Sequence, residues 1–356
     1  MNTKKWFKNC IIAIVSAIVL IFALVLLVDP FFHYHKPIFK YKLIEPRYIN
    51  DGISRHFDFD AVITGTSMSQ NFKPSQMDVL FGTNSVKMSY EGAGYEELSA
   101  CLERTLKRNP QVKTVLWTVD HNGLLRTPDW SQYSDYPTYL YDDNPLNDAP
   151  YVYNKYILYH ALVPDVFMTL KGQDSMSMDE YASWDEPTGI NCVYGGKYDD
   201  DDILPMEMEL SEAEAAQVAQ TFDENILSVV QAHPDTTFYI FITPYSMYNW
   251  YRLWATGQTY KYIEAQRIAT ERMLECPNVK LYTFFEHHEV IENLDNYRDE
   301  AHYAPWINEQ IMNWIYEGEG LVTKENYEER IKTQADYYLN FDYDAWIDEI
   351  DDAYEE

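Results

Sequence analysis

Two serines lie one residue apart in the stretch DAVITGTSMSQNF, residues 60–72, and either has the hydroxyl of a nucleophile. A serine hydroxyl attacks a carbonyl carbon readily only when a nearby base takes its proton. His302, in the sequence DEAHY, can be that base, and Asp299 lies three residues upstream, where a helical turn would bring its carboxylate to the imidazole. Ser67 follows Gly-Thr directly, whereas Ser69 can instead bond to the start of the next turn.

Each of these residues also has a purely structural interpretation. Gly-Thr-Ser ends many strands, and a lone histidine in a loop is more often structural than catalytic. The catalytic interpretation therefore depends on the order of several motifs along the chain and on the elements that bring them together.

Short apolar runs alternate with helical patterns along most of the chain. The expected strands are 61–65, 85–90, 114–120, 237–244 and 279–285, and the expected helices are 95–109, 210–233, 259–275 and 304–318. Ser211 and Glu214 have the spacing of a capping box, and Pro305 suits a first helical turn. This alternation predicts an α/β domain with a mostly parallel, five-stranded sheet.

Polar residues follow each expected strand, at the sheet edge where ligands bind in such folds. In chain order, the residues at these strand ends are Ser67, Gly92, Asp120, His121, Asn122, Tyr245, Asp299 and His302. Because the carboxyl ends of parallel strands meet at one edge, we expect these residues to lie close together.

The order of these motifs resembles the SGNH/GDSL hydrolases over roughly residues 58–318. The DxxHY ending and an apolar N-terminus are similar to a membrane-tethered bacterial subset of that superfamily. This subset includes the D-alanyl-lipoteichoic acid biosynthesis protein D and the SGNH proteins that modify exopolysaccharides with acyl groups. The resemblance implies a flavodoxin-like three-layer α/β/α sandwich and a Ser-His-Asp triad formed by Ser67, His302 and Asp299.

The resemblance also implies an oxyanion hole made by the Ser67 N–H, the Gly92 N–H and the Asn122 side-chain amide. The family's Gly-Asp-Ser turn reads Gly-Thr-Ser here, with Thr66 in place of the Asp. Its Gly-x-Asn-Asp block reads VDHN, so Asp120 or His121 can take the place of Asn122. Asp120, Tyr245 and Tyr303 are further candidates to line the substrate site. The implied chemistry requires no metal or other cofactor.

The first thirty residues predict a membrane anchor. Residues 10–28 carry no charge, and nineteen residues at about 1.5 Å each make roughly 28 Å of helix, close to the hydrocarbon thickness of a bilayer. A cleaved signal peptide would have a shorter apolar core and small residues at its end. The preceding lysines favour a cytoplasmic N-terminus and an extracytoplasmic C-terminal domain, and the expected aromatic interface belt is Phe31, Phe32 and Tyr34.

The composition limits the partners of the chain. It has 57 Asp and Glu residues against 27 Lys and Arg residues, which argues against nucleic acid and anionic lipid because phosphates would be repelled. The cysteines outside the anchor are scattered and indicate neither a zinc site nor a disulfide framework.

The expected organisation has five parts. They are a cytoplasmic segment 1–9, the anchor 10–28, a stalk 29–57, the α/β domain 58–320 and an acidic extension 321–356. The α/β domain contains an insertion at about 124–205, in which the acidic run 199–202 is expected to be a solvated loop.

These observations favour a tethered serine esterase or O-acyltransferase that acts outside the cytoplasm. The resemblance implies an acylated cell-surface polysaccharide as substrate and a membrane-bound O-acyltransferase as partner. The alternative is a non-catalytic SGNH-like module that binds glycan or assists the assembly of such a complex.

Overall fold

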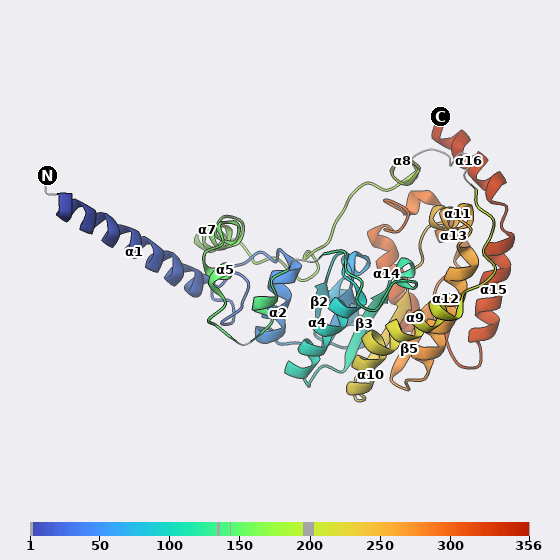
Figure 1. Cartoon of the computed structure of the whole chain (residues 1–356), viewed down its shortest axis with the longest axis horizontal. Helices are drawn as coiled ribbons and strands as arrows, with labels where there is room; N and C mark the ends of the chain where they lie inside the picture. The colour runs from blue at the N-terminus through green and yellow to red at the C-terminus, as the bar shows by residue number, and fades with distance from the viewer. Residues whose placement is uncertain (1–2, 134–135, 143, 195–202, 356) are drawn as a thin grey trace. The chain divides into compact units, whose positions relative to one another are not determined.

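A computed structural model of the chain describes residues 3–133, 136–142, 144–194 and 203–355, so the acidic run 199–202 lies outside the described residues. The chain divides into two compact units (Figure 1). The first unit consists of Met1–Asp58 and Asp135–Ala182, and the second of Phe59–Ser134 and Ser183–Glu356. The segment expected to be an insertion is therefore divided between the units.

A mixed six-stranded sheet forms the centre of the second unit. Its strand order is β2-β1-β3-β4-β5-β6, with β1 Ala61–Gly65, β2 Ser85–Ser89, β3 Thr114–Val119, β4 Thr237–Ile242, β5 Val279–Thr283 and β6 Leu321–Val322. The first five strands are parallel, and β6 pairs with β5 in the antiparallel direction. The prediction of five strands was wrong because β6 has only two residues, too few to show a strand periodicity.

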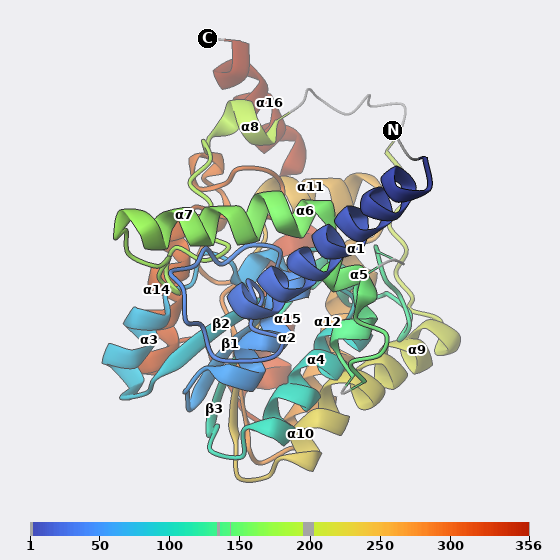
Figure 2. The ribbon, with the colours of Figure 1, turned by 90° about the vertical axis from the view of Figure 1, so that its left-hand side faces the viewer.

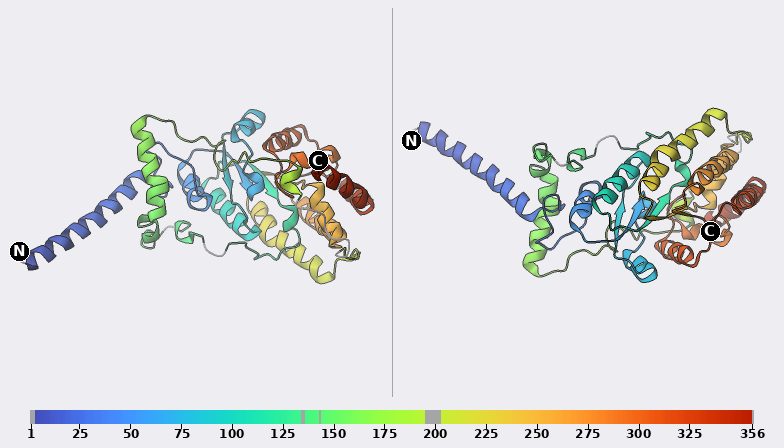
Figure 3. Two further views of the ribbon diagram at one scale, coloured as in Figure 1. Left: turned by 90° about the horizontal axis from the view of Figure 1, so that it is seen from above. Right: turned by 90° about the horizontal axis from the view of Figure 1, so that it is seen from below.

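Two groups of helices pack on this sheet. The helix α3 (Pro74–Phe81) contacts α14 (Pro305–Glu317), while α4 (Tyr95–Arg108), α10 (Ser228–Ala232), α9 (Glu212–Phe222) and α12 (Thr259–Leu274) form a second connected group. Figure 3 shows the strands lying between light-blue α3 on one side and teal α4 and yellow α9 on the other. Every residue of β1 and β2 is buried, as a sheet covered on both faces requires.

Local signals set several of the helix ends. The capping box is present: the Glu214 N–H donates to Ser211 Oγ, and the Ser211 N–H donates to the Glu214 carboxylate at 2.9 Å. Pro305 begins α14, as predicted, and the helix ends at Gly318, whose φ is +80°. The expected helix 210–233 is formed by α9, a π-helical turn and α10.

The remaining helices of the second unit lie in loops and at the C-terminus. They are α8 Ile190–Val193, α11 Met247–Ala255, α13 His288–Ile291, α15 Tyr327–Asn340 and α16 Tyr343–Glu355. The acidic tail is mostly helical, and α15 packs against α12. Tyr338 of α15 stacks on Trp250 with ring centroids 3.9 Å apart, which joins the tail to the core.

The first unit is helical. Its elements are α1 Thr3–Val28, α2 Pro46–His56, the 3₁₀ helix η3 Thr138–Leu140, α5 Ala149–Val152, α6 Lys155–Ile157, the π-helical segment η4 Leu158–Leu162 and α7 Val163–Lys171. By length and composition α1 can cross a membrane, as predicted. Its buried residues are Val25 and Val28, near its C-terminal end, where it contacts α5 and η4.

The prediction of an aromatic interface belt at the end of this helix was wrong for Phe31 and Phe32. Each ring is 1% exposed. Phe31 packs against Tyr48 and Tyr151, and Phe32 against Tyr41 and Phe57, so both belong to the core of the first unit. The chain turns inward after α1, and the two rings follow it.

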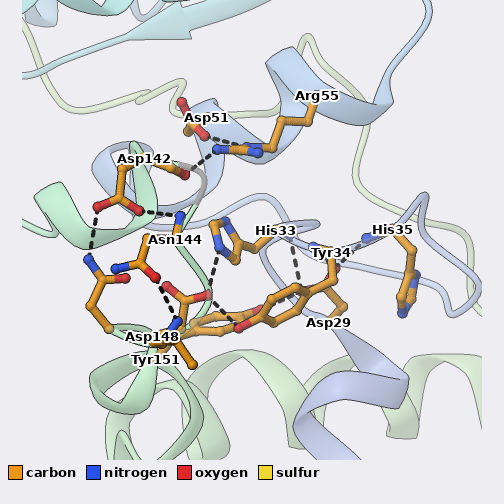
Figure 4. Close-up of polar contacts among 12 residues, drawn as sticks. Asp29, His33, Tyr34, His35, Asp51, Arg55, Asp142, Asn144, Asp148 and Tyr151 are labelled. Atoms are coloured by element: carbon orange, nitrogen blue, oxygen red, sulfur yellow. Dashed lines mark hydrogen bonds and ion pairs between the residues drawn. The ribbon is translucent and has the colours of Figure 1, made fainter.

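Asp29 forms that turn (Figure 4). The residue is fully buried, with a φ of +45°. Its carboxylate accepts the backbone N–H groups of residues 33, 34 and 35 at 2.7–3.0 Å and the hydroxyl of Tyr151 at 2.8 Å. A second carboxylate, Asp148, accepts the Tyr34 hydroxyl at 2.8 Å and lies 3.2 Å from His33 Nε2. Asp29 thus accepts four hydrogen bonds, three of them from backbone N–H groups of the turn.

We predict that Asp29→Asn lowers the free energy of unfolding of the first unit by about 2–4 kcal/mol, because an amide cannot accept all of these hydrogen bonds. Asparagine tolerates a positive φ, so backbone strain does not explain the loss. The measurement is hydrogen exchange of first-unit peptides in the full chain as urea is raised. The matched control is Asp58→Asn, which removes an 89%-exposed carboxylate paired with Lys36 and should change stability by less than about 0.5 kcal/mol. Equal urea midpoints for the two variants would contradict the role of Asp29.

Candidate active site

The end of β1 presents Ser67 at the carboxyl edge of the sheet. Gly65 has a φ of +148°, and a Cβ built there would lie 1.9 Å from Thr118 Oγ1, so the close approach of β3 requires glycine. A short 3₁₀ turn, Ser67–Ser69, follows directly. The side chain of Asn308 in α14 donates to the Met68 carbonyl at 3.2 Å, which joins this turn to the helix after the DEAHY sequence.

The structure brings Ser67, His302 and Asp299 together in one chain of hydrogen bonds. Ser67 Oγ lies 2.7 Å from His302 Nε2, and His302 Nδ1 lies 2.7 Å from Asp299 Oδ2 and 2.9 Å from Asp299 Oδ1. The carboxylate accepts from Nδ1–H, so the other ring nitrogen is free to accept the Ser67 proton. This is the arrangement expected of a nucleophile, a base and the group that orients the base.

A bend, rather than the predicted helical turn, sets the spacing of Asp299 and His302. Asp299 Oδ1 accepts the backbone N–H groups of Ala301 and His302 at 2.9 and 2.8 Å. The loop is held to the end of β4, because the Ser246 hydroxyl donates to the Glu300 carbonyl at 2.8 Å. Asp299 therefore orients both the imidazole and the backbone that carries it.

The electrostatics keep Asp299 ionised. Burial alone would raise the pKa of this carboxyl, but hydrogen bonds from the His302 ring and from the backbone of His302 and Ala301 outweigh it and lower the pKa below its ordinary value. An ionised Asp299 holds the imidazole in one orientation at neutral pH.

A cavity of about 340 Å³ opens beside Ser67 and His302. Gly92 and Asn122, the other predicted oxyanion residues, line the same cavity. Gly92 has a φ of +63°, a backbone conformation that favours glycine. Within the part of the chain that the structure describes, the N–H groups of Ser67 and Gly92 have no acceptor. They are thus available to a ligand in this cavity.

Asp120 lines the cavity and is hydrogen-bonded to Thr66. The Thr66 hydroxyl lies 2.8 and 2.9 Å from the two Asp120 carboxylate oxygens and donates to them. Burial raises the pKa of Asp120 to about 6, although the Thr66 hydrogen bond and the charges of His302 and Arg126 oppose the shift.

The other sequence candidates lie near the site without forming it. His121 is fully buried among Trp250, Tyr262 and other rings, and burial lowers its pKa to about 3. Tyr245 lines the cavity, although its side chain is largely buried. Tyr303 is not one of the lining residues: it is buried and packs against Tyr297.

Ser69 has a structural role in the same turn. It is fully buried, and its Oγ lies within hydrogen-bond distance of the Thr66 carbonyl at 2.8 Å and of Ser89 Oγ at 2.6 Å. Ser69 therefore holds the turn that presents Ser67, as the sequence suggested.

Residues of the segment 124–133 complete the cavity, and sequence reasoning missed them. Arg126, Trp130 and Gln132 all line it. The Arg126 guanidinium lies 3.3 Å from the centroid of the Trp130 ring, and no carboxylate among the described residues pairs with it. The sequence indicates an insertion here and contains no motif in this segment, so it did not predict that these residues line the cavity.

Comparison of the chain with models of protein families finds no match, and comparisons with curated proteins and with solved structures find none either. The resemblance to the SGNH/GDSL hydrolases therefore depends on the order of the motifs in the sequence.

We predict that Asp120→Asn stabilises the chain at alkaline pH. A folded-state pKa of about 6 against an ordinary value of 3.8 means that the folded state binds this proton more tightly, so stability falls as pH rises between about 4 and 6. Removing the charge should raise the free energy of unfolding by about 3 kcal/mol at pH 8 and by about 1 kcal/mol at pH 4.5. Urea unfolding at both pH values tests this, with the exposed Asp129→Asn as control. A gain that is the same at both pH values would refute it.

Proposed function

We propose that the chain is a membrane-tethered, extracytoplasmic serine esterase or O-acyltransferase of the SGNH/GDSL type. The observation that carries the proposal is the chain of hydrogen bonds from Ser67 through His302 to Asp299. Ser67 is the nucleophile, His302 the general base and acid, and Asp299 the residue that orients His302.

The reaction proceeds in two steps. Ser67 Oγ attacks the carbonyl carbon of an ester while His302 Nε2 takes the hydroxyl proton, and His302 then returns this proton to the departing alcohol. Water or a sugar hydroxyl attacks the acyl-enzyme in the second step, again losing its proton to His302. In both tetrahedral intermediates the negative oxygen accepts hydrogen bonds from the Ser67 N–H, the Gly92 N–H and the Asn122 amide.

The fold and the N-terminal helix support the rest of the proposal. The strand order β2-β1-β3-β4-β5 is that of a flavodoxin-like α/β/α sandwich, as the resemblance implies. The helix α1, with lysines before its apolar run, favours a single-pass anchor with a cytoplasmic N-terminus. The substrate is then an acylated cell-surface polysaccharide, and a membrane-bound O-acyltransferase is the partner that would supply acyl groups.

The surroundings of Arg126 favour a substrate that carries an anionic group. Its guanidinium is held against Trp130 in the cavity and has no ion-pair partner among the described residues, in a chain with 30 more acidic than basic residues. An arginine held in this way can bind a carboxylate or phosphate with two parallel hydrogen bonds.

We predict that a fluorophosphonate probe labels the full chain in detergent at Ser67. Ser67→Ala should abolish labelling, and His302→Gln should slow it by about a thousandfold or more, because no base then takes the proton. In-gel fluorescence with mass spectrometry of the labelled peptide gives both results.

Ser69→Ala is the control for this experiment. It loosens the turn that presents Ser67 and so slows labelling, but the labelled residue should still be Ser67. Folded wild-type protein that is not labelled would contradict the enzyme and favour the non-catalytic glycan-binding module. Hydrolysis and transfer are then distinguished by the products formed with and without a sugar acceptor.

We further predict that Arg126→Gln lowers kcat/KM for an ester with a carboxylate on its acyl group, such as p-nitrophenyl hemisuccinate, by about tenfold or more. The neutral p-nitrophenyl acetate should change by less than about twofold, because it makes no ion pair. An equal loss for both esters would mean that Arg126 shapes the cavity and does not bind the carboxylate.

A further inference from the structure

The first unit contains one continuous helical segment, residues 155–171, with an apolar exposed side. The segment is formed by α6, η4 and α7. Its exposed large apolar side chains are spaced three or four residues apart, so they share one face. We call this face the outer face; its residues are Tyr156, Tyr159, Val163, Phe167 and Leu170, with exposed fractions of 43–79%.

The opposite side of this segment is anchored to the rest of the first unit. Ile157 and Ala161 are buried there. Asp165 Oδ1 accepts the Lys42 N–H at 3.0 Å, and Thr169 Oγ1 accepts the Lys40 N–H at 2.7 Å. The segment is therefore a fixed part of the unit and not a loosely attached helix.

The segment lies at the end of α1. The π-helical part η4 contacts α1, whose buried residues, Val25 and Val28, are confined to its C-terminal end. Figure 2 shows green α6 and α7 running across α1, and Figure 1 shows α7 nearly end-on beside the base of α1. The apolar run 10–28 is about 28 Å long, so its end coincides with the edge of the hydrocarbon layer that it spans. A helix that crosses α1 there lies along the membrane surface.

We propose that the outer face is buried in the interfacial region of the bilayer, so that residues 155–171 form an interfacial helix beside the membrane anchor. The proposal rests on the proposed membrane anchoring of α1. Tyrosine is suited to this depth, because its ring enters the apolar layer while its hydroxyl stays hydrated.

The lysines at the two ends of the helix also favour binding at the bilayer surface. Lys155 and Lys171 lie at its two ends, and the Lys171 ammonium is 4.5 Å from the centroid of the Phe167 ring. A lysine can lay its carbon chain along an apolar surface and keep its ammonium at the headgroups. An uncharged or zwitterionic surface suffices, because the attraction comes from apolar area and not from net charge.

The test is hydroxyl-radical footprinting of the full chain in phosphatidylcholine nanodiscs that contain one chain each, read residue by residue by mass spectrometry. We expect Tyr159, Phe167 and Leu170 to be modified about fivefold less than their exposed fractions imply. Val79, which is 84% exposed in the second unit, is the unprotected reference. Ile18 and Leu20 report in the same sample whether α1 is embedded.

Two matched variants sharpen the result. Val163→Glu places a charge in the middle of the outer face and should restore modification of Tyr159 and Phe167 at least about threefold, whereas Val79→Glu should not. Both valines are exposed, so neither change removes core packing.

The outcomes separate the two proposals. Protection of Ile18 and Leu20 without protection of the outer face would overturn the interfacial helix and leave the anchor in place. Modification of all these residues at the rate of Val79 would overturn the anchor, and the interfacial helix with it. Protection of the outer face only in nanodiscs that contain two chains would assign this face to a second copy of the chain and overturn the lipid proposal.

Discussion

The hydrogen bond between Ser67 and His302 joins residues 235 positions apart in the sequence, and the parallel sheet makes it possible. Ser67 follows β1, between β2 and β3 in the sheet, while His302 lies in the loop after β5. That loop lies outside the sheet, and an isolated antiparallel bridge between Tyr297 and Tyr303 closes it around His302. Contacts to neighbouring segments hold it in place: Ser246 donates to the Glu300 carbonyl, and Asn308 donates to the turn of Ser67. Errors of an ångström in these contacts would break the geometry that the proposed catalysis requires.

Two carboxyl groups near the imidazole differ in their electrostatic environments. Asp299 receives hydrogen bonds from His302 and the adjacent backbone, which lower its pKa. Asp120 is more deeply desolvated and is bonded to the Thr66 hydroxyl, and its pKa is raised to about 6. Environments that separate two pKa values in this way give two chemically similar groups different roles. The ionised Asp120 makes the folded chain less stable near neutral pH, which is an expected cost of a polar cavity beside a buried sheet.

Sequence patterns that extend over more than four residues predicted the main strands and helices of the second unit. The five parallel strands and the capped helix that begins at Ser211 have strong local signals, and local signals are enough to define them. The strand β6 is too short for such a signal, and Arg126 has none because only the path of its loop brings it to the cavity. Asp299 was identified by its spacing, but the spacing did not reveal the bend that brings it to His302, since an Asp can cap a bend or lie on a helix.

The aromatic residues of the first unit show why proximity in sequence does not establish contact with a membrane. Phe31 and Phe32 follow the apolar helix directly and have the composition of an interface belt, but the carboxylate of Asp29 turns the backbone inward and buries both rings. The exposed rings at the same end of α1 come from residues 155–171, more than a hundred positions later. A hydrophobic side chain at a membrane surface must be exposed in the folded protein, and burial is decided by the turn that Asp29 stabilises. The turn that Asp29 stabilises therefore removes Phe31 and Phe32 from the surface at this end of α1.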